Sequence, residues 1–445
     1  MQRQMLESNE ADNRSRNVKT NIIWSFILKA LSVGLSFLIL PLTVHYLTSV
    51  EYGVWVTLFS VMNWVNMLDM GIGLGLRNRL AEAVACNDIN LVKRYISAGF
   101  FSLFGIGVCL LIFFVIGVNF IDCQTVFNTK EIPKDDLFLA TLFTGVFVII
   151  AFILSVINQI YYAYQQAAKT GWINIAHNLL MLLLVYCLTL QTEHSLLKFV
   201  FCFGIALLVS RMIFLVDFFR NNREVMPDIS LVKKKYIKNI MNIGMQFFII
   251  QLSVICMFNS ANILITQRLG PEHVMAYDIV FKIFNVVTII HGIICSPLWN
   301  AYTEAYVRHD FSWLRQVMRK MLLLMLPIGI MSFILVIETD WIIRFWIRKD
   351  VFIPAYLPMV TGVFAFVSCL NNIFAIFLNG VGKIRLQMYL GIISAIIVIP
   401  LSWYFMGVMD ATGMILAIVI CMLMATIPLG IQVKNILICK KANLF

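Results

Sequence analysis

Twelve long hydrophobic stretches, separated by short polar connections, fill the chain between Ile22 and Val433. A helix needs about 20 apolar residues to cross a hydrocarbon core of about 30 Å. Lipid cannot satisfy exposed backbone N–H and C=O groups, and these stretches are too long for tilted barrel strands, so we expect helices. The predicted spans are residues 22–46, 54–76, 96–120, 137–162, 172–190, 196–219, 240–266, 277–299, 321–337, 353–378, 386–406 and 412–433. The sequence thus predicts an all-α polytopic membrane protein with about 12 transmembrane helices and no soluble domain.

Composition supports the same class, with 61% hydrophobic and 13% charged residues. The net charge of +11 would suggest a nucleic-acid partner in a soluble protein, but here its location matters more. If the N-terminus is cytoplasmic, 24 of the 34 basic residues lie in inner segments and 7 in outer ones. The positive-inside rule therefore places both termini in the cytoplasm, with the basic residues anchored against anionic membrane lipids and no nucleic acid bound.

The N-terminal segment before Ile22 is polar, and the first span is too long for a signal-peptide core and lacks a small-residue cleavage site. We expect this segment to remain in the protein. The ten cysteines are scattered without disulfide or metal-ligand spacing. The sequence predicts no metal, no cofactor and no catalytic residue.

An internal repeat organises the chain, because the stretch from Leu47 to Arg94 aligns with the stretch from Leu269 to Gln316. The matched pairs are Phe59 with Phe281, Asn63 with Asn285, Asn78 with Asn300, Glu82 with Glu304, Ala83 with Ala305, Asp88 with Asp310, and Lys93 with Arg315. Because six spans is an even number, two six-helix halves enter the membrane in the same orientation, related by a pseudo-two-fold along the membrane normal. Repeats of this kind build transporters that hold substrate between the halves.

The repeat also sets the predicted domain boundaries. Residues 1–21 form a cytoplasmic segment, 22–219 and 239–433 form the N-terminal and C-terminal six-helix halves, 220–238 form a basic cytoplasmic linker, and 434–445 form a cytoplasmic tail. A channel is disfavoured because nothing resembles a selectivity-filter loop or a ring of like charges.

Placing a charged residue within a membrane span costs free energy, so such residues indicate functional positions. Lys29 and Asp69 each lie seven residues from the inner end of their span, about 10 Å into the membrane. They are candidates for an ion pair, which either fixes helix packing or forms a cavity site that titrates or contacts substrate. Gln251 and His291 occupy the equivalent positions in the second half. His291 could carry a proton near neutral pH, although a lone histidine in a span is more often hydrogen-bonded to a neighbour.

Four basic residues are candidates for a cationic central cavity: Lys29, Arg77, Arg211 and Lys282. Such a cavity suits an anionic headgroup, and the arginine fork matches phosphate. The competing interpretation for Arg211 and Lys282 is that their long side chains snorkel to an interface. No ATP-binding domain is present, so energy would come from an ion gradient, the membrane potential or the substrate gradient. The candidates for proton coupling are Asp69, His291 and, at the inner rim, Glu304.

Glycine and proline mark candidate hinges and close helix contacts. Gly71 and Gly75 have GxxxG spacing, which permits close packing, and no strand or Gly-Lys-Ser/Thr accompanies them as a nucleotide-binding loop would require. Pro41 and Pro297 interrupt spans, as do Pro327, Pro358 and Pro400. Broken helices of this sort are common around cavities.

The segment from Lys29 through Glu82 resembles the start of Wzx-type polysaccharide and O-antigen flippases of the multidrug/oligosaccharidyl-lipid/polysaccharide exporter superfamily. The resemblance is carried by Lys29, Pro41, the YL…EYG turn (Tyr46, Leu47, Glu51, Tyr52, Gly53), and then Asp69, Gly71, Arg77 and Asn78. The C-terminal half is less specific, and Gln251 leaves it less basic than a symmetric phosphate cage would need.

The resemblance implies translocation of undecaprenyl-pyrophosphate-linked oligosaccharide units from the inner to the outer leaflet of the bacterial inner membrane, with a polysaccharide polymerase as a candidate partner. Lys29, Arg77 and Arg211 would then attract the anionic head, and Asp69 would gate or couple protons. Alternatives are an ion-coupled exporter of drugs or organic cations, a glycan polymerase or transferase, and a membrane scaffold. An exporter of cations would favour acidic cavity residues, and a polymerase a larger outer loop than residues 121–136 provide.

Overall fold

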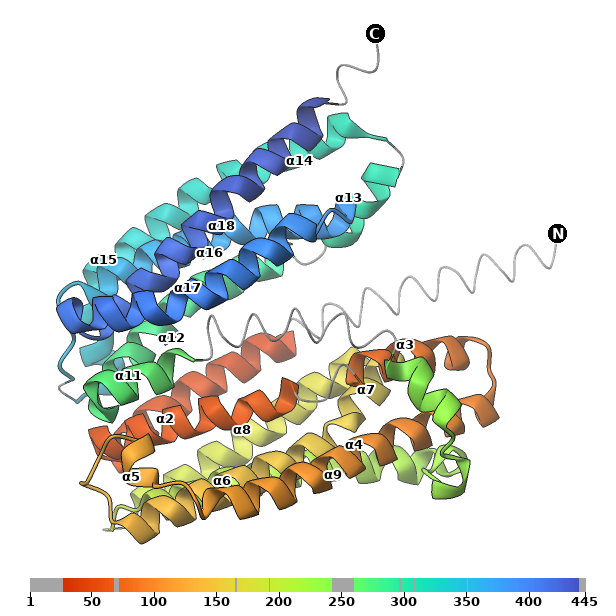
Figure 1. Ribbon diagram of the computed structural model, residues 1–445, viewed down its shortest axis with the longest axis horizontal. Coiled ribbons are helices and arrows are strands. Elements are labelled where there is room, and N and C mark those ends of the chain that lie inside the picture. Colours follow the sequence, from red (N-terminus) through yellow and green to blue (C-terminus); the bar gives the residue numbers. More distant parts are fainter. Residues whose placement is uncertain are drawn as a thin grey trace. The chain divides into compact units, whose positions relative to one another are not determined.

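The computed structural model describes residues 27–67, 72–164, 166–191, 193–241, 260–295, 298–307, 309–349 and 351–439, apart from the side chains of a few residues within these ranges. The described residues form helices joined by short connections and contain no strand (Figure 1). Ten helical segments among them are long and apolar enough to cross a membrane. The predicted all-α polytopic membrane fold is confirmed.

The chain divides into two compact units. The first unit comprises residues 1–48, 61–126 and 130–249, and the second comprises 49–60, 127–129 and 250–445. The helices of the first unit are residues Ile27–Tyr46, α3 (Ile72–Ala85), α4 (Ile89–Val118), α5 (Cys123–Val126), α6 (Lys134–Leu154), α7 (Val156–Ala163), α8 (Ala167–Thr189) and α9 (Leu196–Asn221), with 3-10 turns η1 (Trp64–Met67), η2 (Arg223–Val225) and η3 (Ile229–Leu231).

The second unit contains most of α2 (Ser49–Asn63) and the helices that follow residue 250. These are α11 (Ala261–Leu269), α12 (Pro271–Cys295), α13 (Leu298–Val307), α14 (Phe311–Leu323), α15 (Met325–Ile347), α16 (Leu357–Val381), α17 (Arg385–Met409) and α18 (Ala411–Cys439). Ser49–Ser60 and Phe127–Thr129 therefore pack with the second unit, although they lie within the predicted N-terminal half.

The predicted span at 54–76 is not one continuous helix. The α-helical part α2 ends at Asn63, a 3-10 turn covers Trp64–Met67, and α3 begins at Ile72. A tightened turn of this kind often marks a strained or hinged position in a helix. The predicted span at 240–266 lies largely outside the described residues.

One face of α15 shows why these helices belong in lipid. Leu326, Ile330, Phe333 and Ile337 are each more than 60% exposed and follow the i, i+4, i+7, i+11 spacing of a single helix face. A soluble protein rarely exposes a continuous apolar stripe of this length. Lipid tails are the environment in which this face is stable.

The repeat is visible in the turns that precede α4 and α14. The carboxylates of Asp88 and Asp310 accept hydrogen bonds from the backbone amides of Leu91 and Trp313, each at 3.0 Å, and so cap the two helices. The preceding residues, Asn87 and His309, have φ values of 53° and 59°. The two aligned segments of the repeat thus adopt the same turn and the same cap.

Arg211 stabilises a break in a spanning helix. At the end of α6 the amide of Ser155 donates to Phe152 O rather than to Ala151 O, four residues back, and α7 begins one residue later. The guanidinium of Arg211 on α9 donates to this Ala151 carbonyl. A carbonyl released from a helix within a membrane needs such a partner, because lipid offers none.

Gly75 allows a close approach within the first unit. A Cβ atom at this position would lie 2.1 Å from the carbonyl oxygen of Ile240. Real Cβ contacts are essentially never this short, so any larger residue would push α3 away from the 240 region. The contact therefore requires glycine.

We expect Gly75→Val to lower the yield of folded protein and its thermal unfolding temperature in detergent, because the added side chain collides with backbone. Gly105→Val is the matched control, since Gly105 lies in α4 with no heavy atom within 4 Å of its Cβ position. Size-exclusion chromatography followed by a thermal scan measures both. Equal behaviour of the two variants would contradict the close contact.

We expect Arg211→Met to destabilise the protein by about 1–3 kcal/mol, because the Ala151 carbonyl loses its donor. Arg211→Lys keeps a donor and should recover part of the loss. Lys198→Met on the same helix is the control, since Lys198 pairs with Glu193 at an exposed position. If Arg211→Met is as stable as the wild type but no longer transports, Arg211 instead has a role in substrate binding.

Candidate functional site

The beginning of α8 connects two of the predicted cavity cations in the first unit. A Cβ at Gly171 would lie 2.9 Å from Cβ of Leu28, the neighbour of Lys29. The preceding residue, Thr170, donates a hydrogen bond to the hydroxyl of Tyr162 at 3.3 Å. The guanidinium of Arg77 lies 4.6 Å from the centroid of the Tyr162 ring. The helix of Lys29 and the side chain of Arg77 therefore approach the same turn of α8.

Arg77 and Lys29 are both exposed within the described part of the chain. Tyr162 holds Arg77 through a cation–π contact, which stabilises a cation without neutralising it. Arg77 can therefore still accept an anionic partner. The predicted partner of Lys29, Asp69, lies outside the described residues, so that ion pair stays a prediction.

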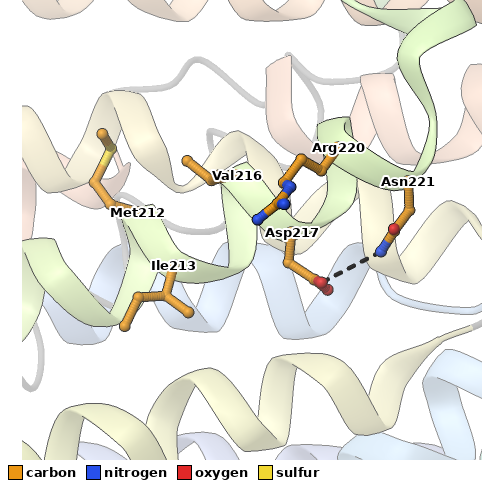
Figure 2. A pocket seen from close by; sticks show the side chains of 6 residues that line it. All are labelled: Met212, Ile213, Val216, Asp217, Arg220 and Asn221. Carbon is orange, nitrogen blue, oxygen red and sulfur yellow. Dashed lines mark hydrogen bonds between the residues drawn. The ribbon is translucent and has the colours of Figure 1, made fainter.

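The same end of α8 carries a further cation, Lys169, which pairs with Asp217 of α9 at 3.6 Å. Asp217 lines an open groove of about 680 Å³ along α9 (Figure 2). Met212, Ile213 and Val216 form its apolar part, and Asp217, Arg220 and Asn221 form its polar end. The amide of Asn221 donates to the Asp217 carboxylate at 3.2 Å. An amphiphilic molecule lying along this face would contact apolar groups at one end and charged groups at the other.

His291 of α12 lies in the interior of the second unit, with 1% of its surface exposed. Its Nε2 atom is 3.3 Å from Sγ of Cys295, and its Nδ1 atom is 3.4 Å from Nδ2 of Asn372 on α16. Both ring nitrogens thus have neighbours that can hydrogen-bond to them. This arrangement is compatible with a packed histidine as well as with a coupling group.

Lys282 also has partners in the second unit. Its Nζ atom is 2.7 Å from the Asp278 carboxylate one helical turn earlier, and 3.3 Å from the Tyr52 hydroxyl of α2. Lys282 and His291 lie nine residues apart on α12, a separation of about 13 Å along the helix axis. The structure therefore places them at different depths rather than in one cluster.

The remaining predicted positions are only partly described. Asp69, Gly71, Gln251 and Pro297 lie outside the described residues, as does the side chain of Glu304, while Pro41 lies within the helix Ile27–Tyr46. In the described part of the chain no His, Cys, Asp and Glu side chains are grouped to hold a metal.

Sequence reasoning missed Asp278 and its contact with Tyr52, a residue that the sequence singled out only as part of the EYG turn. The i, i+4 spacing of Asp278 and Lys282 on a helix was an available signal for an ion pair. No local pattern indicates the contact between Tyr52 and Asp278, because the two residues are 226 positions apart. Asp217 was likewise a polar residue within a predicted span.

Comparison with known proteins identifies the family. The sequence matches the family described as "Polysaccharide biosynthesis protein" over residues 18–302, and the family described as "MatE" over residues 247–404. A protein of Salmonella typhimurium named "Putative O-antigen transporter" is 22% identical over 407 residues, covering 89% of this chain and 91% of that protein.

Solved structures share the fold. An inward-facing multidrug resistance MATE family transporter of the MOP superfamily aligns with a TM-score of 0.79 at 13% identity, covering 95% of this chain and all of the other. A MOP superfamily transporter from Pyrococcus furiosus, described as having a binding pocket of reverse polarity, aligns with a TM-score of 0.62 at 14% identity, and the alignment covers 95% of each chain.

The family match covers more than half of the chain. The solved structures above share its all-helical fold. The protein belongs to the polysaccharide biosynthesis protein family, and its described helices form a multi-pass membrane fold.

Proposed function

We propose that this protein moves undecaprenyl-pyrophosphate-linked oligosaccharide units from the inner to the outer leaflet of a bacterial inner membrane, with both termini in the cytoplasm. The similarity to a protein named as an O-antigen transporter supports this substrate class. Alternating access through a cationic central cavity would carry the charged head, and the prenyl tail would remain in lipid. Surface polysaccharide would be the product of a polymerase that acts on the exported units.

The observation that carries the proposal is the exposed Arg77 guanidinium, held by Tyr162 at 4.6 Å. An arginine fork forms paired hydrogen bonds with phosphate oxygens, and a pyrophosphate offers several of them. Lys29 would add a second exposed cation at the same turn of α8. Arg211 and Lys282 each have a partner within the protein, so we assign them a smaller share of headgroup binding.

Coupling would use groups that change charge or hydrogen bonding during the cycle. Our candidates are Asp69, His291 and Glu304, with Gln251 as the neutral counterpart of Lys29. Among these, His291 is described in full, and its contacts with Cys295 and Asn372 would have to change if it took up a proton.

Export of drugs or organic cations is the second candidate function. The match of residues 247–404 to the MatE family favours it. A cation exporter needs accessible acidic groups in its cavity, whereas the exposed charges described near α8 are weighted toward Lys and Arg. Asp217, which could attract a cation, is paired with Lys169.

The two functions are separated by the sidedness of lipid-linked glycan in cells that lack this protein and any redundant flippase. A sugar-specific probe is applied before and after the inner membrane is permeabilised. We expect repeat units to be trapped on the cytoplasmic side. Normal outward exposure would contradict flipping and move cation export to first place.

We expect Arg77→Gln to reduce glycan export about tenfold or more, because a charge-assisted contact with the headgroup is lost. Arg77→Lys should retain part of the activity, since lysine keeps the charge but not the fork. Arg319→Gln is the control, because Arg319 is an exposed arginine on the same predicted side of the membrane. Surface glycan and protein abundance are measured together, and full export by Arg77→Gln at normal abundance would exclude the contact.

A further inference from the structure

A polar seam joins α2 to α11 and α12 within the second unit. Charged side chains are seldom placed between membrane helices without a function, whereas hydroxyl and amide side chains commonly hydrogen-bond from one helix to another. We define the seam as Tyr52, Thr57 and Ser60 of α2, Asn262 and Thr266 of α11, and Asp278 and Lys282 of α12.

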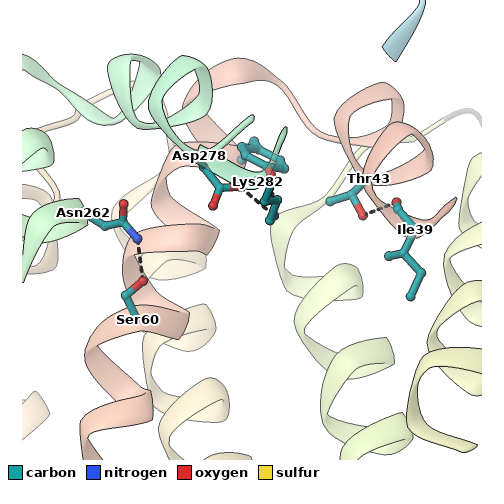
Figure 3. A network of polar contacts seen from close by, with 7 residues as sticks. Ile39, Thr43, Ser60, Asn262, Asp278 and Lys282 are labelled. Carbon is teal, nitrogen blue, oxygen red and sulfur yellow. Dashed lines mark hydrogen bonds and ion pairs between the residues drawn. The ribbon is translucent and has the colours of Figure 1, made fainter. Parts of the chain in front are cut away.

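The first layer of the seam is a three-way contact around the Asp278 carboxylate. The Tyr52 hydroxyl donates to Oδ2 of Asp278 at 2.6 Å, and Nζ of Lys282 lies 2.7 Å from the same oxygen. Figure 3 shows the Asp278 and Lys282 side chains meeting beside α2. Tyr52 is 1% exposed, so its hydroxyl is committed to this contact. The ion pair is thereby tied to a different helix.

The second and third layers use neutral groups. Oγ1 of Thr57 and Oγ1 of Thr266 are 2.7 Å apart and fully buried. Because Thr266 donates its own proton to Asn262 O at 2.8 Å, Thr57 is the donor between the two threonines. The Asn262 amide donates to the Ser60 hydroxyl at 2.6 Å, as Figure 3 also shows.

Close backbone packing accompanies these bonds. A Cβ at Gly53 would lie 1.7 Å from the carbonyl oxygen of Pro271, at the first turn of α12. Gly53, Thr57 and Ser60 follow i, i+4, i+7 spacing and so share one face of α2. The outer connection contributes as well, because the Asn128 amide donates to the carbonyls of Thr266 and Gln267 at 3.3 and 3.4 Å.

The seam joins a helix of the N-terminal half of the sequence to two helices of the C-terminal half. By sequence, α2 belongs to the N-terminal half, yet Ser49–Ser60 packs with the second unit. Tyr52 and Asp278 follow the connections at residues 47–48 and at Gly270, which the distribution of basic residues predicts to be on the outer side. An opening to that side that parts the two halves of the sequence would separate α2 from α11 and α12.

We propose that this seam is an outer latch, which holds the protein closed toward the outer side and must open once in each transport cycle. The inference rests on the proposed alternating access. Interhelical hydrogen bonds in membranes are individually weak, and each of these groups can bond to water once the pathway is hydrated. A polar seam can therefore open and reclose.

The latch is not a feature that the repeat requires. In the repeat alignment, Tyr52 corresponds to Val274, Asp278 to Val56, and Lys282 to Ser60. The three groups of the first layer thus have no equivalents in the other half, whereas the capping aspartates do. Because the two repeats enter the membrane in the same predicted orientation, the equivalent positions lie on the same outer side, and the first-layer contact is formed only once there.

The first test measures opening by chemical labelling. Thr57→Cys places a thiol at a fully buried position, in a background whose ten native cysteines are replaced. A membrane-impermeant maleimide is added from outside, with and without Tyr52→Phe. We expect Tyr52→Phe to raise the labelling rate about threefold, the effect of one interhelical hydrogen bond on a two-state equilibrium.

Tyr389→Phe is the matched control, since it removes the hydroxyl of a tyrosine that is 58% exposed on α17 of the same unit. It should leave the labelling rate unchanged. Equal rates in the Tyr52→Phe and parent proteins would overturn the latch.

The second test locks the seam. Thr57→Cys and Thr266→Cys together replace two oxygens that are 2.7 Å apart, so oxidation should form a disulfide. We expect glycan export to stop on oxidation and to recover on reduction, while each single variant is unaffected by oxidant. Export at the parent rate by the cross-linked protein, or failure of the pair to cross-link, would overturn the latch.

The two tests separate this inference from the proposed function. Maleimide labelling needs no substrate, so it reports on the latch even if the parent protein exports no glycan. Absence of export by the parent protein overturns the glycan assignment alone. Unchanged labelling in Tyr52→Phe overturns the latch alone.

Discussion

Lipid offers no hydrogen-bond partners, and this one constraint explains much of the described structure. Every polar group exposed by a break in a helix must find a partner within the protein. The Ala151 carbonyl, released where α6 ends, is bonded by Arg211. The Asp278 carboxylate is bonded by both Lys282 and Tyr52. These charged residues in the spans therefore contribute to helix packing, whether or not they also bind substrate.

The need for a partner distinguishes among four basic residues that the sequence grouped together only because they lie within or beside spans. Lys29, Arg77, Arg211 and Lys282 all qualified as charged residues within or beside spans. The structure gives Arg211 a backbone carbonyl and Lys282 a carboxylate, whereas the contact described for Arg77 is with an aromatic ring. Arg77 thus keeps the charge that an anionic headgroup needs, and it becomes the strongest candidate for headgroup binding.

The sequence predicted the parts of the fold that depend on local pattern. Span length gave the all-helical membrane class, and the alignment of the chain with itself predicted a repeat whose two capping turns, at Asp88 and Asp310, match in detail. The break between α2 and α3 was missed, because a continuous apolar run does not reveal where a helix tightens. The contact between Tyr52 and Asp278 could not be read from one sequence, since its two residues are 226 positions apart.

The proposed function requires that this protein itself move a lipid-linked glycan across a bilayer. The most direct measurement uses purified protein in vesicles that contain a prenyl-pyrophosphate-linked oligosaccharide, with a glycosidase added outside. We expect the glycosidase to cleave about half of the glycan in vesicles without protein, and nearly all of it once the protein is present. Cleavage that stops at about half in both samples would show that the protein does not move the glycan.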